Sequence, residues 1–212
     1  MPIDKLQQAN QKLQQLSQRL DKSNLIQRAL FSITELTSNT ESMEEFYSSI
    51  HDSIKELMYA DNLFIALYDS KNEIIKFDYY VDSEDQVELS ELDDVPMEIA
   101  RKTCTGYMLK TGTLCHKSKA EMIQMEKQGG IVLQGPASCD WLGVPLKDNE
   151  NIIGALVVQS YIEDINYNEE DEEILQFVSA QIAQLLKRKQ FEQELQSINH
   201  NLEERIENRT KD

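Results

Sequence analysis

Two apolar runs joined by a short polar stretch restrict the architectures open to this chain. They form the segment CDWLGVPLKDNENIIGALVVQSY, residues 139–161, which predicts a β-hairpin. Successive side chains of a strand point to opposite faces, so Trp141 and Gly143 lie on one face of the first strand, and Leu142 and Val144 lie on the other. Because both faces are apolar, we expect a sheet that is covered on both sides.

The other periodic segments predict an α+β domain around that hairpin. A second hairpin is expected from LFIALYD and EIIKFDYYVD, residues 63–82, where Ile75, Phe77 and Tyr79 alternate on one face. A short strand is expected at residues 113–118. Helices are expected at residues 24–36, from an N-cap at Thr40 or Ser42 to Met58, at 96–110, at 119–128, and onward from an N-cap at Asn168. This order predicts an antiparallel β-sheet with helices mainly on one face.

Apolar stripes with heptad-like spacing mark both ends of the chain. A helix with such a stripe would leave it in water, so we expect each end to form a parallel coiled coil with a second copy. Packing of each helix on its own domain is the alternative. The seam residues of the expected homodimer are Leu6, Leu13, Leu16, Leu20, Phe191, Leu195, Ile198 and Leu202. The predicted organisation is an N-terminal coiled-coil helix at 1–23, a globular domain at 24–187 and a C-terminal coiled-coil linker at 188–212.

The charge of the chain argues against several classes of partner. The formal net charge is −17, and residues 82–98 carry eight carboxylates and no base. Nucleic acids and anionic membranes are contacted through Lys and Arg, so neither is an expected partner. The acidic run lacks the D-x-[DN]-x-[DN]-G spacing of a calcium loop, and we expect no metal site.

Hydropathy and cysteine usage predict a cytoplasmic protein. No apolar run approaches the roughly 20 residues that cross a bilayer, and the first residues lack the apolar core of a signal peptide. We therefore expect no membrane insertion. Cys104, Cys115 and Cys139 are an odd number of cysteines without C-x-x-C spacing, which suits a reducing compartment.

Motifs of catalysis are missing from the sequence. It contains no G-x-x-x-x-G-K-[ST], no G-x-G-x-x-G and no G-x-S-x-G. The adjacent Cys115 and His116 do not make a catalytic dyad, because such pairs meet through the fold and need an orienting third group. We expect this chain not to be an enzyme, and the sequence identifies no cofactor.

Four segments together resemble a GAF domain, the small-molecule sensor module of bacterial signalling proteins. They are LFSITELTSNTESMEEFYSSIHDSIKELMYADNLFIALYD, GYMLKTGTLCHKS, CDWLGVPLKDNENIIGALVVQSY and YNEEDEEILQFVSAQIAQLL, which span residues 30–186 in the order found in that family. The resemblance is closest to GAF domains that precede diguanylate cyclase or histidine kinase modules. It implies an antiparallel sheet with a ligand chamber beneath a cover formed by residues 83–130.

The resemblance and the alternation of the strands together suggest which residues line that chamber. The candidates are inward strand positions and residues of the covering helix. They are Phe64, Ala66, Tyr68, Phe77, Tyr79, Cys104, Tyr107, Met108, Trp141, Gly143 and Ala155. Plain core packing is the alternative for each, and no ligand is identified.

The resemblance implies a dimeric sensor that passes a movement of its last helix to an output domain. The expected output is a diguanylate cyclase making cyclic di-GMP, although this chain has no GGDEF or EAL string of its own. The alternatives are a sensor of a histidine kinase, a ligand-free structural dimerisation module, and an enzyme of the methionine sulfoxide reductase type that uses one of the cysteines as nucleophile.

Overall fold

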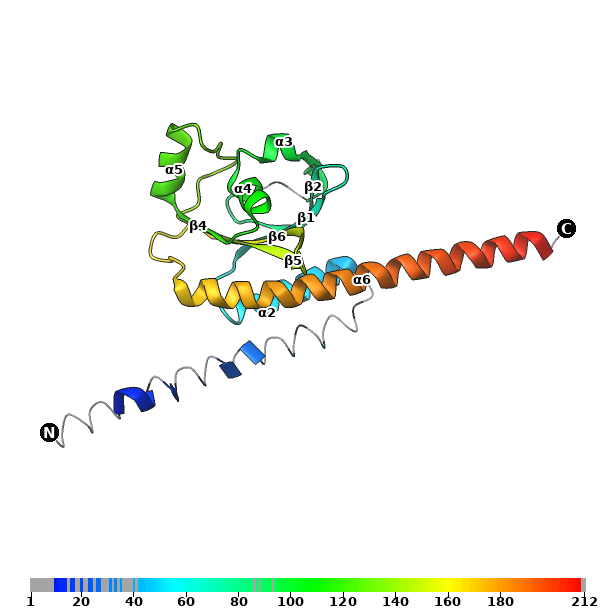
Figure 1. Cartoon of the computed structure of the whole chain (residues 1–212), viewed down its shortest axis with the longest axis horizontal. Helices are drawn as coiled ribbons and strands as arrows, with labels where there is room; N and C mark the ends of the chain where they lie inside the picture. Colours follow the sequence, from blue (N-terminus) through cyan, green and yellow to red (C-terminus); the bar gives the residue numbers. More distant parts are fainter. Residues whose placement is uncertain are drawn as a thin grey trace.

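The computed structural model describes residue 40, residues 42–85, 87, 89–92 and 94–210, and scattered positions between 10 and 35. Side chains are described as far as residue 199. The described chain forms a sheet domain from which one long helix extends (Figure 1).

A single six-stranded sheet forms the centre of the domain, and all its strand pairs are antiparallel. The strand order is β3-β2-β1-β6-β5-β4. The strands are β1 (Asn62–Asp69), β2 (Ile74–Val81), β3 (Val95–Pro96), β4 (Cys115–Ser118), β5 (Asp140–Asp148) and β6 (Asn151–Ser160). The two predicted hairpins, the short strand and the antiparallel sheet are therefore confirmed.

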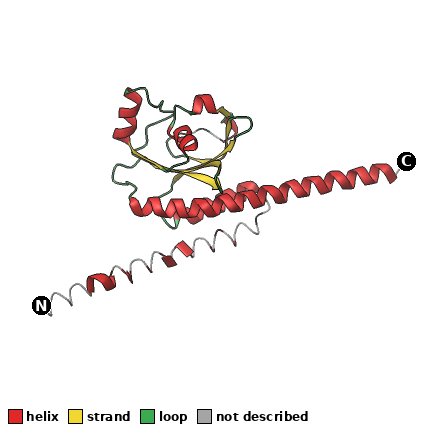
Figure 2. Ribbon diagram, in the orientation of Figure 1, coloured by secondary structure: helices red, strands yellow, loops and turns green. Residues whose placement is uncertain are grey.

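Helices cover the two faces of this sheet unequally. They are α2 (Met43–Lys55), α3 (Met97–Ala100), α4 (Cys104–Thr111), α5 (Lys119–Lys127) and α6 (Glu169–Thr210), with a 3-10 turn at Leu89–Glu91. Figure 1 shows α2 and α6 along one face and the shorter α3, α4 and α5 over the other. Figure 2 shows the strands between these two layers. The long helices thus lie on one face, as predicted.

Side-chain caps explain where several helices begin and end. The Oγ of Ser42 accepts a hydrogen bond from the amide of Glu45 at 3.1 Å, and the Oδ1 of Asn168 accepts one from the amide of Glu170 at 2.7 Å. These bonds satisfy amides that lack a partner within the helix. Gly112 closes α4 with φ 65°, a left-handed conformation that glycine adopts without steric cost. The predicted N-caps at Ser42 and Asn168 and the predicted end at Gly112 are confirmed.

Each face of the sheet carries its own apolar core. On the α2 and α6 side, Leu142, Val144 and Leu156 are fully or almost fully buried against the two helices. On the opposite side, Trp141 and Ala155 belong to a second buried cluster beneath α3, α4 and α5. The two faces of β5 therefore enter different cores, which is the double coverage that the hairpin predicts.

The expected single helix at residues 96–110 is wrong, because the chain breaks between α3 and α4. The Oγ1 of Thr103 donates to the carbonyl of Ala100 at 2.8 Å and accepts from the amide of Gly106 at 3.1 Å, so Thr103 closes one helix and caps the next. The backbones are in close contact at this corner. A Cβ on Gly106 would lie 1.9 Å from the carbonyl oxygen of Ala100. The break needs glycine at this position.

A β-bulge in β2 interrupts the alternation that was expected for Ile75, Phe77 and Tyr79. Ala66 pairs with Phe77 but Ile65 pairs with Tyr79, so Asp78 is an extra residue in β2. Beyond the bulge, the side chains of β2 point to the opposite faces from those that regular alternation predicts. Tyr79 consequently packs against the α2 and α6 core, and the expectation that it shares a face with Phe77 is wrong.

The helical ends carry exposed apolar side chains where the structure describes them. Those of the expected seam are Leu13, Leu16, Leu20, Phe191, Leu195 and Ile198. Leu6 and the side chain of Leu202 lie outside the described residues. Helix α6 runs without a break to Thr210, as expected, whereas the pairing of these ends with a second copy stays a prediction. Within the described residues no helix is both long and apolar enough to span a lipid bilayer.

Candidate ligand-binding site

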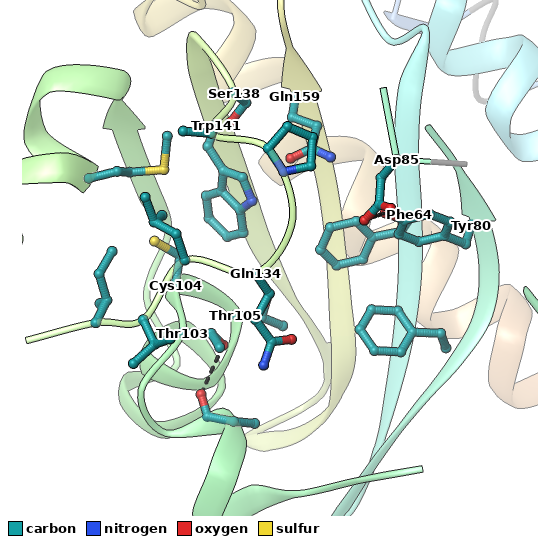
Figure 3. A pocket seen from close by; sticks show the side chains of 18 of the residues that line it. Phe64, Tyr80, Asp85, Thr103, Cys104, Thr105, Gln134, Ser138, Trp141 and Gln159 are labelled. Atoms are coloured by element: carbon teal, nitrogen blue, oxygen red, sulfur yellow. Dashed lines mark hydrogen bonds between the residues drawn. The ribbon is translucent and has the colours of Figure 1, made fainter. Parts of the chain in front are cut away.

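A cavity of about 280 Å³ lies on the face of the sheet opposite α2 and α6 (Figure 3). Strands β1, β2, β5 and β6 form its floor, and its cover comes from α3, α4, α5 and the loop before β5. It is lined by Phe64, Ile75, Phe77, Tyr80, Asp85, Leu92, Val95, Ala100, Thr103, Cys104, Thr105, Met122, Ile131, Val132, Leu133, Gln134, Pro136, Ala137, Ser138, Trp141, Gln159 and Tyr161. The volume and mixed lining suit a small organic molecule.

Aromatic rings form one wall of the cavity. The ring centroids of Phe64 and Phe77 are 5.5 Å apart in an edge-on arrangement, and those of Phe64 and Tyr80 are 6.1 Å apart and stacked. Trp141 is 6% exposed and completes the set from β5. Figure 3 shows its indole facing the same space as the ring of Phe64. A guest here would therefore meet several π-faces.

Gly143 makes room for the indole of Trp141. A Cβ at position 143 would lie 2.5 Å from Cη2 of Trp141 and 3.1 Å from the sulfur of Met108. The absence of a side chain at Gly143 therefore lets the indole lie along the strand beneath α4. The position of Trp141, and with it the shape of the cavity, depends on this glycine.

Backbone hydrogen bonds anchor the cover. The amide of Val132 donates to the carbonyl of Lys102 at 2.5 Å, and the amide of Leu133 donates to Oε1 of Glu126 at 3.2 Å. These bonds tie the loop before β5 to the turn between α3 and α4 and to α5. The cover is thus tied to its neighbours by hydrogen bonds at its edge, in addition to the burial of Met122 and Ile131 in the apolar cluster beneath it.

An acidic loop closes one side of the cavity. The Oδ2 of Asp82 accepts hydrogen bonds from the hydroxyl of Tyr161 at 3.0 Å and from the side-chain amide of Gln159. The Oδ1 of Asp82 accepts the amide of Asp85 at 2.8 Å. The Oδ2 of Asp85 in turn accepts the hydroxyl of Tyr80 at 3.2 Å. Asp82 thus organises the loop, and Asp85 faces the cavity.

Burial and the two carboxylates keep the neighbouring phenols protonated. Burial and the charges of Asp82 and Asp85 raise the pKa of Tyr80. Burial and the Asp82 carboxylate raise the pKa of Tyr161. Both hydroxyls therefore stay hydrogen-bond donors at any physiological pH.

The described lining contains one carboxylate, that of Asp85, and no Lys, Arg or His. No described Lys, Arg or His makes a salt bridge with Asp85, although other acids of the same region, such as Asp94 with Lys76, are paired. The negative charge at the cavity is therefore not neutralised by any described base.

The structure brings only part of the predicted pocket together. Phe64, Phe77, Cys104 and Trp141 line the cavity. Ala66, Met108 and Ala155 are buried in the same cluster without lining it, Tyr68 packs at its edge, and Gly143 lies beside Trp141. Whether any of these residues contacts a ligand stays a prediction.

Two of the predicted residues lie elsewhere. Tyr79 is on the opposite face because of the bulge, and Tyr80 takes its place in the cavity. Tyr107 is 48% exposed, because α4 turns Cys104 and Met108 toward the core and Tyr107 toward solvent. Neither side chain lines the cavity.

Sequence reasoning missed the polar lining of the cavity. Asp85, Gln159 and Tyr161 come from the acidic loop, the end of β6 and the residue after it. The run of carboxylates at residues 82–98, which has no base, was the available signal for Asp85. Nothing local in the sequence places Gln159 beside Asp82, since the two are 77 residues apart.

The three cysteines are unpaired. Cys104 and Cys115 are buried, and Cys139 is half-buried with its thiol donating to the carbonyl of Tyr161 at 3.3 Å. The hydrogen bond with Cys115 and burial raise the pKa of the Cys104 thiol. Because the thiolate is the reactive form, Cys104 is a poor nucleophile although it lines the cavity. Among the described residues no cluster of His, Cys, Asp and Glu could hold a metal ion.

Known proteins share this architecture. The GAF domain of a phosphoenolpyruvate-protein phosphotransferase from Coxiella burnetii has a TM-score of 0.62 at 12% identity, over 79% of this chain and 95% of that one. The GAF domain of a two-component sensor histidine kinase from Bacillus halodurans has a TM-score of 0.55 at 16% identity, over 72% and 98%. The free methionine-R-sulfoxide reductase of Neisseria meningitidis has a TM-score of 0.57 at 13% identity, over 78% and 90%. These likenesses show the fold.

The sequence itself supports the same assignment. A search of curated proteins finds no match. The family model described as GAF domain matches residues 40–187, which include the whole sheet, its cover and the first half of α6. This chain therefore belongs to the GAF domain family.

Proposed function

We propose that this chain is the regulatory sensor module of a bacterial signal-transduction protein, which binds a small molecule in the cavity and passes a movement through α6 to an output domain. The observation that carries the proposal is the cavity of about 280 Å³, lined by aromatic and polar side chains, on the face of the sheet opposite α6. A ligand-free dimerisation module would be expected to fill this space with its own side chains.

A short path connects the cavity with the beginning of α6. Trp141 lines the cavity, and the preceding residue, Asp140, faces the other way on β5. The carboxylate of Asp140 accepts the amide of Tyr167 at 2.7 Å and lies 3.1 Å from Nε2 of His116. His116 also contacts Glu172 in the first turn of α6. A shift of β5 caused by a guest beside Trp141 would therefore reach α6 directly.

The exposed face of α6 supports a dimer. Phe177 is 48% exposed, and Phe191, Leu195 and Ile198 are exposed along the same helix. Phe191, Leu195 and Ile198 keep the heptad intervals of four and three residues, whereas the positions that continue these intervals back to Phe177 are the polar residues Gln181, Gln184 and Arg188. We propose a parallel homodimer along this stripe, in which a rotation or slide of α6 in each copy is the signal.

The output that we propose is a diguanylate cyclase, on the strength of the sequence resemblance. The uninterrupted α6 supports a role for this helix as a connector. A fusion that joins α6 in heptad register to a diguanylate cyclase catalytic domain tests the proposal. Cyclic di-GMP production should change when the cavity is filled, and a fusion shifted out of register by two residues serves as the control. Equal activity in filled and empty states would contradict the proposed transmission.

Native mass spectrometry of the chain as purified from cells tests the sensor function. A homodimer with extra mass that is released on unfolding supports the proposal and identifies the ligand. An apo dimer that no compound of a metabolite screen stabilises supports the structural alternative, since a ligand at about 100 times its dissociation constant should add roughly 2.7 kcal/mol to the free energy of unfolding. A monomer contradicts the proposed dimer.

A further inference from the structure

The residues of the cavity wall indicate which charge a bound ligand would carry. Three rings, those of Phe64, Tyr80 and Trp141, face the space into which the Asp85 carboxylate points (Figure 3). The faces of such rings carry negative electrostatic potential and attract cations, Trp most strongly. Aromatic faces beside a carboxylate favour a positive charge.

The described lining also lacks a base that would hold an anion. Carboxylates and phosphates are held by Arg, Lys or converging N–H donors, and none of the lining residues is basic. The net charge of −17 further disfavours an anion in solution and concentrates cations around the domain. An anionic ligand would approach Asp85 without any described base to offset the repulsion.

The position of Asp85 is fixed by contacts on two sides. Its amide donates to Oδ1 of Asp82 at 2.8 Å, and its Oδ2 accepts the hydroxyl of Tyr80. Oδ2 also lies so close to Gly135 of the cover that a Cβ there would come within 2.8 Å of it. The carboxylate is therefore held between the acidic loop and the cover, at the aromatic end of the cavity. No described base competes for it.

The opposite end of the cavity has a different polarity. Thr103, Cys104 and Thr105 line it at the N-terminus of α4, where the helix dipole is positive. This end disfavours a cation and suits an electron-rich group such as a hydroxyl or carbonyl oxygen. The two ends thus orient an elongated guest.

We infer that the cavity takes an organic cation, a substituted ammonium compound whose charged end lies among Phe64, Tyr80, Trp141 and Asp85 and whose electron-rich end points toward α4. This inference rests on the proposed sensor function and specifies the chemical class of its ligand. Binding of the ammonium group would neutralise Asp85 and draw the acidic loop and the cover together on one guest.

A pair of probes of equal shape tests the charge. Choline and its neutral analogue 3,3-dimethylbutan-1-ol differ mainly in the quaternary nitrogen, and benzyltrimethylammonium adds an aromatic body. Trp141 is the single tryptophan of the chain, so a titration followed by its fluorescence reports directly on the cavity. At least one of the two cations should bind, and choline should bind at least about tenfold more tightly than the alcohol if the charge is recognised by desolvated rings.

Two substitutions that remove the same charge distinguish a direct effect of the Asp85 carboxylate from the effect of the overall negative charge of the loop. Asp85→Asn should weaken cation binding by about tenfold or more, because it removes the one carboxylate of the described lining. Glu84→Gln changes the charge of the same loop at an exposed position outside the lining and should leave the affinity unchanged. Equal binding of choline and the alcohol, no binding of either cation up to its solubility limit, or equal effects of the two substitutions would overturn the inference.

The identity of a copurified molecule distinguishes this inference from the proposed function. A released molecule with a quaternary or protonated nitrogen supports both. A released anion or neutral molecule overturns the cation inference and leaves the sensor function standing. An empty cavity that no compound of a broad screen enters contradicts the sensor function as well.

Discussion

His116 on β4 contacts Glu172 on α6, with 2.7 Å between Nδ1 and Oε1. The Nε2 of the same ring lies 3.1 Å from each carboxylate oxygen of Asp140, which is buried. Burial alone lowers the pKa of His116, but the hydrogen bonds to Glu172 and Asp140 outweigh it, and the net pKa is raised. An imidazole whose protonated form is favoured by two carboxylates thus joins the edge of the sheet to the first turn of the helix that leaves the domain.

The raised pKa predicts a loss of stability with rising pH. A histidine whose folded pKa exceeds its unfolded value stabilises the fold fully below the unfolded pKa of about 6.5, and the contribution is lost as the pH rises through the folded pKa. Hydrogen bonds to charged groups contribute about 1.5–3 kcal/mol each. The free energy of unfolding in urea should therefore fall more steeply above about pH 6.5 in the wild type than in His116→Gln.

The buried histidine of α2, His51, provides a control of opposite sign. Burial lowers the pKa of His51, whose Nδ1 lies 2.9 Å from the hydroxyl of Tyr79. Its contribution is present above the unfolded pKa and is lost as the pH falls through the folded one. His51→Gln should therefore flatten the acidic side of the stability profile. Parallel profiles for wild type and His116→Gln would show that the contact with Glu172 carries no charge.

Gly143→Ala should move the indole of Trp141. The added Cβ would lie 2.5 Å from Cη2 of the indole, so the ring of this cavity-lining residue must rotate. Overpacking of this kind costs about 1–3 kcal/mol. Urea unfolding and the emission maximum of this single tryptophan should both change.

Gly129→Ala is the matched control for that substitution. Gly129 has φ 73° and nothing within 4 Å of an added Cβ, so alanine there introduces backbone strain only. Its cost should be about 1 kcal/mol with an unchanged emission maximum. If Gly143→Ala leaves the emission of Trp141 unchanged as well, the packing described for the two residues is wrong.

The strands could be predicted because their signals are local. Period-two alternation and short polar turns mark both hairpins, and Ser42, Asn168 and Gly112 are helix-end residues at the observed ends. The prediction of which β2 side chains share a face failed, because it depends on a single inserted residue. Because Asp78 is an extra residue in β2, Tyr80 and not Tyr79 lines the cavity. Period-two alternation alone does not predict a bulge.

The polar part of the cavity depends on long-range pairing and was therefore not predictable from local patterns. Asp85 reaches the cavity because Asp82 accepts hydrogen bonds from Gln159 and Tyr161, which lie 77 and 79 residues further along the chain. Tyr107 was expected in the cavity with Cys104 and Met108 of the covering helix, whereas α4 buries Cys104 and Met108 and exposes Tyr107. The apolar candidates Phe64, Phe77 and Trp141 were found because their burial follows from strand register alone.

The thiols should react in an order set by their burial. Cys104 and Cys115 are 8% and 4% exposed, whereas Cys139 is only half-buried. With an aromatic disulfide reagent in native buffer, one thiol should react rapidly and two slowly, at a rate limited by opening of the fold. Cys139→Ser should remove the fast phase and nothing else. Rapid reaction of Cys104 or Cys115 in that variant would reopen the question of a nucleophilic cysteine and favour the enzyme alternative.

A charge on the stripe of α6 should dissociate the proposed dimer. Leu195 is 60% exposed and lies between Phe191 and Ile198 at heptad spacing, so Leu195→Glu would place a carboxylate in the apolar seam. Burial of a leucine side chain contributes about 1.5–3 kcal/mol, and an unpaired charge costs more, so the dissociation constant should rise at least about tenfold. Gln193→Glu adds the same charge at an exposed position off the stripe and should leave the dimer intact. Light scattering after size-exclusion chromatography measures both masses over a range of concentrations. A dimer that survives Leu195→Glu would place the interface elsewhere, and the transmission of a signal along paired α6 helices would then have to be abandoned.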